Sequence, residues 1–134
     1  MNVAFHAIED VDDALLKYAI IVAKYQDKWI FCKNKKRDWE IPGGHREENE
    51  SIMDAAKREL FEETGAAQFT LTPLFAYSIN NYGLVFFANV TELGHLPESE
   101  IERIDFFPDM PSPCSFPQAH PMLFERVKKI LQTT

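Results

Sequence analysis

Residues Gly43 to Ala66 read G-G-H-R-E-E-N-E-S-I-M-D-A-A-K-R-E-L-F-E-E-T-G-A. Two glycines lead into a short polar loop that ends at Glu50. About fourteen residues of helix-forming sequence follow Ser51, and Thr64-Gly65 ends them. The pattern predicts a loop, a helix and a second loop, and the rest of the chain is interpreted around them.

Three glutamates near the end of the predicted helix, Glu59, Glu62 and Glu63, fall within about 100° of one another on its surface. The neighbouring surface is apolar, formed by Ile52, Met53, Ala56 and Leu60. Ionised carboxylates at this spacing repel one another, and the negative helix C-terminus disfavours them further. The cluster is therefore either a solvated acidic face or a site for cations. Oxygen ligands of this kind suit Mg²⁺.

A longer set of positions covers the whole stretch: Gly44, five residues, Glu50, seven residues, Arg58-Glu59-Leu60, one residue, Glu62-Glu63, one residue and Gly65. This spacing resembles the signature box of the Nudix hydrolases. Ala66 departs from it, because the family usually has a larger aliphatic residue there. We expect that departure to affect packing at the helix end more than chemistry.

The resemblance implies an α/β protein, specifically a Nudix-type α/β/α sandwich with a mixed β-sheet. It implies a Mg²⁺ site, with Mn²⁺ as the alternative ion, whose ligands are the Gly43 carbonyl, Glu59, Glu62, Glu63 and Glu100. Glu50 and Arg58 are expected to orient these carboxylates. The family uses no single general base, so Glu62, Glu59 and Glu100 all stay open for that role.

Glu100 lies in an acidic segment, Leu96 to Asp105, that precedes Phe106. The segment resembles a family loop in which an acid six residues before an aromatic pair completes the metal site. Counting back from Phe106 favours Glu100, with Glu98 and Glu102 as alternatives. A solubilising acidic loop is the simpler interpretation.

A basic run, residues 33–37, precedes the glycine pair. A solvated loop is its simplest interpretation, but in Nudix proteins this region commonly faces the nucleotide. Arg37, and then Lys35 and Lys33, are therefore predicted to contact substrate phosphates, where arginine can form two parallel hydrogen bonds.

Three other side chains are weighed as substrate contacts. Tyr82 lies sixteen residues after Ala66, where some dinucleoside-polyphosphate hydrolases of the family have a base-stacking tyrosine. Packing on its own hairpin is an equally good interpretation of Tyr82. Trp39 is predicted to pack in the core or at its rim. His120 is interpreted as a helix cap or surface group.

Apolar runs predict an edge strand and two hairpins, made by Val3 to Ile8, Tyr18 to Lys24, Lys28 to Cys32, Phe69 to Ile79 and Leu84 to Val90. Other segments are predicted to be a turn at Asn80 to Gly83, an extended loop at Phe107 to Pro117 and a helix from Pro121 to the end.

Composition limits the class of protein. With 134 residues and 46% hydrophobic content, the chain fits one domain spanning residues 1–134. The net charge of −7 argues against stable nucleic-acid or membrane-surface binding. Cys32 and Cys114 are far apart in sequence, which disfavours zinc or a disulfide framework and predicts a cytoplasmic location.

The leading hypothesis for function is a pyrophosphohydrolase of nucleoside triphosphates, including oxidised ones of the 8-oxo-dGTP type. Dinucleoside polyphosphates and ADP-ribose are the alternative substrates. A non-catalytic Nudix domain that senses nucleotides is the hypothesis from another class. The predicted partner is thus a small nucleotide, and a homodimer is expected by resemblance.

Overall fold

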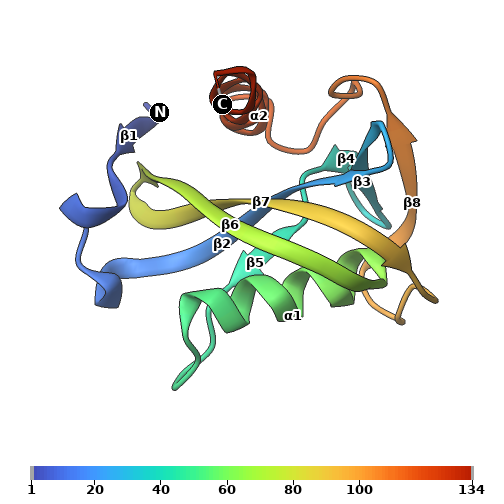
Figure 1. Cartoon of the computed structure of the whole chain (residues 1–134), viewed down its shortest axis with the longest axis horizontal. Coiled ribbons are helices and arrows are strands. Elements are labelled where there is room, and N and C mark those ends of the chain that lie inside the picture. Colours follow the sequence, from blue (N-terminus) through green and yellow to red (C-terminus); the bar gives the residue numbers. More distant parts are fainter. Residues whose placement is uncertain (1, 134) are drawn as a thin grey trace.

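A mixed eight-stranded sheet lies between two helices in the computed structural model, which describes residues 2–133 (Figure 1). The strands are β1 Ala4–His6, β2 Leu16–Tyr25, β3 Lys28–Asn34, β4 Trp39–Glu40, β5 Gly43–His45, β6 Ala66–Ile79, β7 Asn81–Leu93 and β8 Ile101–Phe107. The helices are α1 Ile52–Thr64 and α2 His120–Gln132, and short 3₁₀ turns occupy Ile8–Asp10 and Asp13–Leu15. The predicted α/β sandwich is confirmed. Within the described residues, neither helix combines the length and apolar character needed to cross a membrane.

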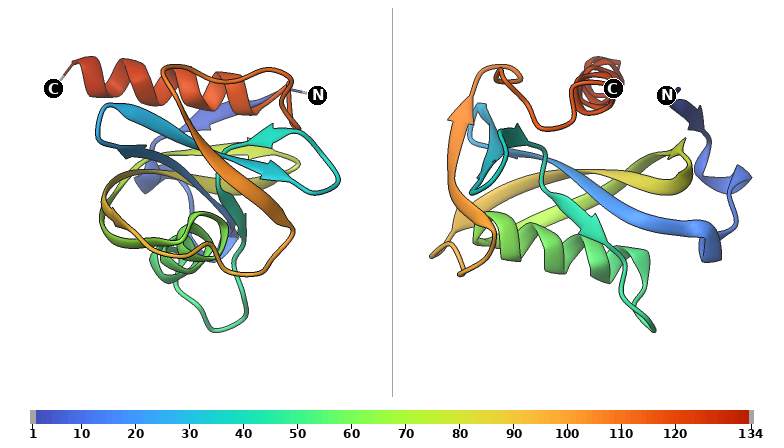
Figure 2. Two further views of the ribbon diagram at one scale, coloured as in Figure 1. Left: turned by 90° about the vertical axis from the view of Figure 1, so that its right-hand side faces the viewer. Right: turned by 180° about the vertical axis from the view of Figure 1, so that it is seen from behind.

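The two helices cover opposite faces of the sheet and run in different directions, since the view that shows α1 from the side shows α2 end-on (Figure 2). Strand β2 illustrates why both faces are apolar. Ala19 and Ile21 pack on the α1 side with Leu60, whereas Ile20 packs on the α2 side with Leu123. Alternate residues of a strand point to opposite faces, so a continuous apolar run serves both cores.

The strand order β1-β6-β7-β2-β3-β4 makes β2 central, and β2 pairs in parallel with β7. Two strands share the other edge of β2. Residues 23–25 pair with β3, and residues 18–20 pair with β5. Strand β3 also pairs with β4 and β8. Strand β4 therefore lies on the β3 side of the sheet, separated from β5, which pairs with a different part of β2. The separation leaves room beside the glycine pair.

Both ends of α1 follow from its sequence. The Ser51 hydroxyl accepts a hydrogen bond from the Asp54 N–H at 3.0 Å, which satisfies one of the free donors of the first turn. Gly65 adopts a left-handed conformation, with φ of 76°, and its N–H donates to the Phe61 carbonyl at 2.8 Å. A side chain is disfavoured at that φ, so glycine ends the helix here. The predicted end at Thr64-Gly65 is confirmed.

The two predicted hairpins are confirmed as β2–β3 and β6–β7. The turn predicted at Asn80 to Gly83 is wrong in extent, because β7 begins at Asn81 and only Asn80 turns, with φ of 67°. The acidic segment predicted as a loop through Asp105 is also shorter. Pairing with β3 makes residues from Ile101 onward part of β8, which ends the loop just after Glu100.

Candidate active site

A cavity of about 550 Å³ opens where β4 and β5 separate. Its lining has two chemically different parts. The acidic part consists of Glu40, Gly43, Gly44, Glu63 and Glu100, and the aromatic part consists of Tyr18, Tyr77, Phe116 and His120. The polar side chains Arg37, Asn81 and Gln118 also line the cavity. A space of this size accommodates a nucleotide.

Arg58 connects the glutamates of the box. Its guanidinium donates to both carboxylate oxygens of Glu50, at 2.8 and 3.0 Å, and also contacts Glu59 at 2.7 Å and Glu62 at 3.1 Å. The same side chain donates to the His45 carbonyl at 2.9 Å. These bonds to Arg58 hold the pKa of Glu50 at about 2. Arg58 therefore links the α1 carboxylates to Glu50 and to the glycine-rich loop. Its role in orienting a metal site stays a prediction.

Burial sets the electrostatics of the acidic part. It raises the pKa of Glu63 to about 8, although the Gly43 N–H donates to that carboxylate at 3.0 Å. Burial also raises the pKa of Glu59, with repulsion from Glu62 and Glu100 adding to the effect. Like charges that face one another in a low-dielectric site disfavour ionisation. A bound cation would reverse that preference.

Space explains why glycine occupies two positions beside these acids. A Cβ on Gly44 would lie 2.5 Å from the carboxyl carbon of Glu59, and a Cβ on Gly43 would lie 2.4 Å from the Ala19 carbonyl oxygen. A side chain at Gly43 would require the β2 backbone to move, and one at Gly44 would displace the Glu59 carboxylate. The glycines thus allow the loop to approach both β2 and the Glu59 carboxylate.

The donor set matches a hard divalent cation in its chemistry. Glu59, Glu62, Glu63 and Glu100 offer only oxygen, and Mg²⁺ sites are typically completed by water and substrate phosphate oxygens. Across residues 2–133 no three acidic, histidine or cysteine side chains already form a ligand cluster. In this arrangement Glu59 and Glu62 both pair with Arg58. The raised pKa values of Glu59 and Glu63 show where positive charge would be most favourable.

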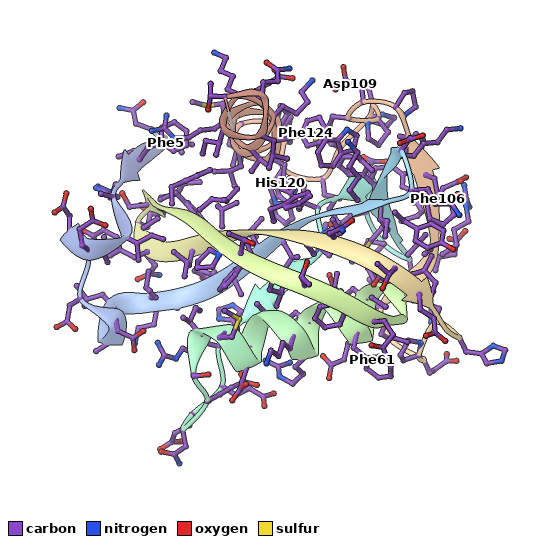
Figure 3. The ribbon with its side chains drawn as sticks, viewed as in Figure 1. Phe5, Phe61, Phe106, Asp109, His120 and Phe124 are labelled. Carbon is purple, nitrogen blue, oxygen red and sulfur yellow. The ribbon has the colours of Figure 1, made fainter. Side chains whose placement is uncertain are left out.

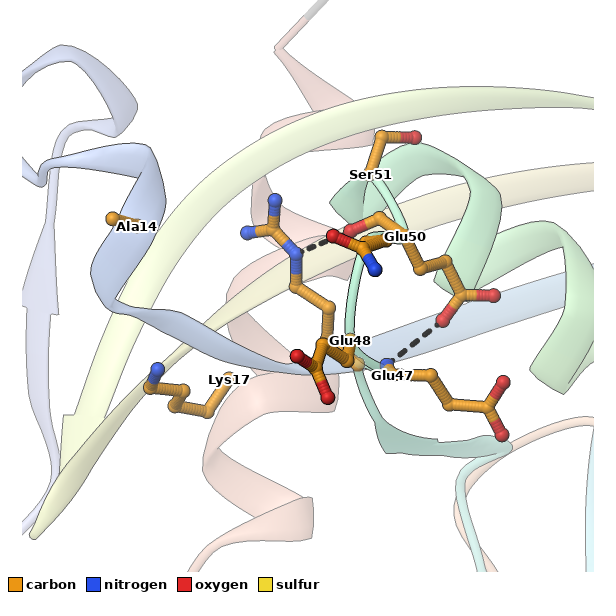
Figure 4. Close-up of a pocket in the computed structure, with 8 residues that line it drawn as sticks. Ala14, Lys17, Glu47, Glu48, Glu50 and Ser51 are labelled. Carbon is orange, nitrogen blue, oxygen red and sulfur yellow. Dashed lines mark hydrogen bonds between the residues drawn. The ribbon is translucent and has the colours of Figure 1, made fainter.

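A second cavity, of about 570 Å³, lies on the loop before α1 (Figure 4). Its walls are mainly charged side chains, and its hydrogen bonds serve the loop itself. The Arg46 guanidinium donates to the Glu50 carbonyl at 2.6 Å, and the Glu47 N–H donates to the Glu50 carboxylate at 2.9 Å. The hydrogen bonds in its walls therefore hold Glu50 in place, and Glu50 in turn binds Arg58.

The residues predicted to contact substrate are separated by the fold. Arg37 lines the cavity, where it pairs with Glu40 at 3.3 Å and lies over the Phe116 ring. Lys35 instead forms an exposed pair with Glu98 at 3.4 Å and does not line the cavity.

Tyr82 is also outside the cavity lining. Its ring centroid lies 5.4 Å from that of His6, and Tyr82 packs against the core on the α1 side. Base stacking by Tyr82 therefore has no support in this arrangement, and packing on its own sheet explains the residue. Trp39 packs edge-on against Phe107 at 4.9 Å, which confirms its predicted packing role.

His120 was interpreted from sequence as a cap or surface group, and that interpretation is wrong. It is only 6% exposed and lies between α2 and the sheet (Figure 3). Its Nδ1 accepts a hydrogen bond from the Ile41 N–H at 3.2 Å, so it supports the strand before the glycine pair. Burial, and then the charge of Arg37, lowers the pKa of His120 to about 4.

Two tyrosines of the cavity, Tyr18 and Tyr77, were also missed. Tyr18 begins one predicted strand and Tyr77 lies near the end of another, and an aromatic residue in a strand ordinarily signals packing. Burial raises the pKa of Tyr77 well above its usual range, so its hydroxyl stays protonated. No local pattern marks these residues as cavity-lining, because only the pairing of the strands brings them there.

Residues 15–110 match the model of the NUDIX domain, and they include both the box and Glu100. The chain belongs to the Nudix family. Nudix hydrolases act on phosphorus-containing anhydrides and generally use divalent metals such as Mg²⁺.

Two curated relatives resemble this Nudix chain over part of its length. Bacillus subtilis (strain 168) YtkD, which has the provisional name 8-oxo-dGTP diphosphatase, is 35% identical over 63 residues, covering 47% of this chain and 40% of YtkD. An RNA pyrophosphohydrolase from Bartonella henselae is 52% identical over 52 residues, covering 39% of this chain and 27% of the relative. The chain spans less than half the length of either relative.

The fold extends the similarity to nearly the whole Nudix chain. A crystal structure of the Bacillus subtilis pyrophosphohydrolase BsRppH superposes with a TM-score of 0.83, covering 98% of this chain and 90% of BsRppH. The identity is 23%, so this likeness concerns the fold alone.

Proposed function

We propose that this Nudix protein hydrolyses the diphosphate linkage of a nucleoside triphosphate, giving a nucleoside monophosphate and pyrophosphate. One observation carries the proposal. The buried carboxylate Glu63 and the exposed Glu100 line a cavity of about 550 Å³ whose other walls combine aromatic and apolar side chains with the polar residues Arg37, Asn81 and Gln118. Acids suited to a cation therefore lie beside a space suited to a nucleoside.

The residues divide the work of this reaction. A Mg²⁺ ion bound through Glu59, Glu62, Glu63, Glu100 and the Gly43 carbonyl would neutralise phosphate charge and acidify water. Arg37 at the cavity wall binds phosphate oxygens. One carboxylate among Glu62, Glu59 and Glu100 accepts the proton of the attacking water as its oxygen bonds to phosphorus and pyrophosphate leaves. Arg58 and Glu50 keep these acids oriented.

The names of the relatives agree on the reacting group. One relative is named for 8-oxo-dGTP and the other for RNA, and both names describe cleavage of a diphosphate linkage. RNA is thus a second candidate, favoured by the 52% identity over the 52 matched residues. The net charge of −7 favours the free nucleotide, because a longer polyanion would meet more repulsion.

A substrate panel tests the proposal. Purified protein with Mg²⁺ or Mn²⁺ is given canonical and 8-oxo nucleoside triphosphates, a short 5′-triphosphorylated RNA, a dinucleoside polyphosphate and ADP-ribose. We expect pyrophosphate release from nucleoside triphosphates that stops when EDTA removes the metal. Faster turnover of the RNA would select the second candidate. Nucleotide binding without turnover of any diphosphate would leave the sensor hypothesis.

A cytoplasmic location and a homodimer remain predictions of the sequence. Gel filtration with light scattering measures the second directly. The activity proposed above depends on neither, because the cavity and its acids come from one chain.

A further inference from the structure

Glu40 is a buried carboxylate in the cavity wall for which the proposed reaction has no role. It belongs to β4, and its side chain is only 7% exposed. A buried charge needs an opposite charge and hydrogen-bond donors to offset the loss of water. For Glu40 both come from the residues just before it, Asn34 and Arg37. The buried acid and the end of the basic run therefore form one hydrogen-bonded unit.

The Arg37 guanidinium has one occupied edge and one free edge. Nε and Nη2 donate to the two carboxylate oxygens of Glu40, at 3.4 and 3.3 Å. A guanidinium offers parallel N–H groups along two edges, one formed by Nε with Nη2 and the other by Nη1 with Nη2. Glu40 takes the first edge. Nη1 has no hydrogen-bond partner within residues 2–133, so the second edge stays available.

Neighbouring side chains restrict how this pair can move. The Cζ atom of Arg37 lies 5.2 Å from the centre of the Phe116 ring, which covers one face of the guanidinium. Asn34, itself 2% exposed, donates at 3.4 Å to the same Glu40 oxygen that accepts from Nη2. The Asn34 side-chain oxygen in turn accepts from the Lys36 N–H at 2.9 Å. The ring therefore limits tilting of the guanidinium, and the anchored carboxylate limits its rotation in the plane.

The charge and shape of the free edge select what it binds. Two parallel N–H groups on a cation match two oxygens of a phosphate group. The Arg37 side chain is 50% exposed and lines the same cavity as Glu63 and Glu100. A phosphate at the free edge would therefore share this space with the acids predicted to bind Mg²⁺, and the cation would offset their repulsion of phosphate.

We propose that Glu40 is a positioning residue, which holds the Nε–Nη2 edge of Arg37 so that the Nη1–Nη2 edge is presented to a substrate phosphate. This inference rests on the proposed triphosphate substrate. Orienting a long side chain before binding lowers the entropy lost when the substrate binds. Glu40 itself would repel a phosphate, so its contribution to binding passes through Arg37.

Kinetics of Glu40→Gln test this role. The amide keeps the size of the side chain but turns an N–H group toward one N–H group of Arg37, so the paired contact is lost. We expect KM for a nucleoside triphosphate to rise about three- to tenfold, with kcat within about twofold, because the acids of α1 are unchanged. Glu125→Gln is the matched control. It removes the acid of an exposed pair with the same i,i+3 spacing and should leave KM unchanged.

A double substitution separates positioning from a direct effect of Glu40 on the acidic part, because the Glu40 charge also acts on Glu63. Adding Glu40→Gln to Arg37→Ala should change KM by less than about twofold, since no guanidinium is left to hold. Two effects that multiply would overturn the proposal, as would a fall in kcat in Glu40→Gln alone. A lower melting temperature with unchanged KM would show that the pair serves stability only, which also overturns it.

Side-chain ¹⁵N spectra of Arg37 separate this failure from failure of the proposed function, and they decide the case if Glu40→Gln does not fold. The probe is inorganic pyrophosphate with Mg²⁺, added to wild-type protein. The Nη signals should shift while the Nε signal, held by Glu40, stays in place. An equal shift of Nε, or no shift at any Arg37 nitrogen, would overturn the proposal even if triphosphates are hydrolysed. The expected Nη shift would support it even if none is.

Discussion

The acidic part of the cavity takes most of its groups from one continuous segment, residues 43–65, whereas the aromatic part is assembled from β2, β6 and the residues around the start of α2. In the segment, one helix and its preceding loop bring Gly44 against Glu59, Arg58 against Glu50 and Gly43 against Glu63. In the aromatic part, Tyr18 and His120 are separated by about a hundred residues of chain.

This difference has a chemical counterpart. Charged groups that must converge on a cation need a rigid local frame, and α1 with its capped ends supplies one. Recognition of the remaining part of a substrate needs only a shaped wall, which side chains from several elements can provide. We therefore expect substitutions in the acidic part to reduce turnover and substitutions in the aromatic part to change which substrate is used.

The largest expected effect is on turnover, from Glu62→Gln. The change keeps the size of the side chain and removes a charge that can bind the cation or accept a proton, so kcat should fall by about 10²- to 10⁴-fold. The Glu62 side chain is 46% exposed, so the melting temperature should stay within a few degrees. Glu125→Gln, another exposed helix glutamate that pairs with a basic residue, is the control and should be silent. Normal kcat, or an unfolded variant, would contradict a role at the metal.

A smaller loss of turnover is expected from Arg58→Lys, which tests whether the hydrogen bonds of Arg58 to the glutamates contribute to catalysis. Lysine keeps the charge but cannot bond both oxygens of Glu50 while reaching Glu59. We expect kcat to fall about 10- to 100-fold with little change in KM, because the acids lose their orientation. Arg103→Lys, at an exposed pair with Glu102, is the matched control. Equal kinetics for both variants would mean that Arg58 serves stability alone.

The sequence predicted the parts of the fold that depend on local spacing. The box, the bounds of α1 and both hairpins follow from residues near one another in the chain, and the structure contains all of them. Their signals are strong because helix ends and apolar runs obey local rules.

The parts that sequence reasoning missed depend on pairing between distant strands. The start of β8 at Ile101 is set by its register with β3, and that pairing leaves no trace in the acidic segment itself. The burial of His120 requires α2 to pack beside Ile41, between β4 and β5, and a histidine before a proline carries no such signal. Substrate-facing residues outside the box were therefore the least predictable.

The next effect concerns stability: burial of His120 in the aromatic part should make the free energy of unfolding depend on pH. The pKa of His120 in the folded protein, about 4, is below its usual value of 6.5, so the unfolded chain binds the proton more readily. The free energy of unfolding should thus fall as pH decreases from about 6.5 to 4, by about 3 kcal/mol from this group. Urea denaturation at several pH values measures it. The difference between wild type and His120→Gln should isolate the histidine, and parallel profiles would show that it is not buried as a neutral ring.

The smallest effects are expected where the fold moved a predicted contact away from the cavity. Lys35→Ala should leave KM within about twofold, because that side chain pairs with Glu98 in solvent, and such pairs contribute little. Tyr82→Phe should be equally silent, since its ring contacts His6 instead of the cavity. Arg37→Ala is the comparison within the same basic run and should raise KM about tenfold, because Arg37 alone of that run lines the cavity. An increase in KM from Lys35→Ala that matches that of Arg37→Ala would mean that the substrate phosphates extend past the cavity. The basic run at residues 33–37 would then bind the substrate as a whole, together with the acidic part of the cavity.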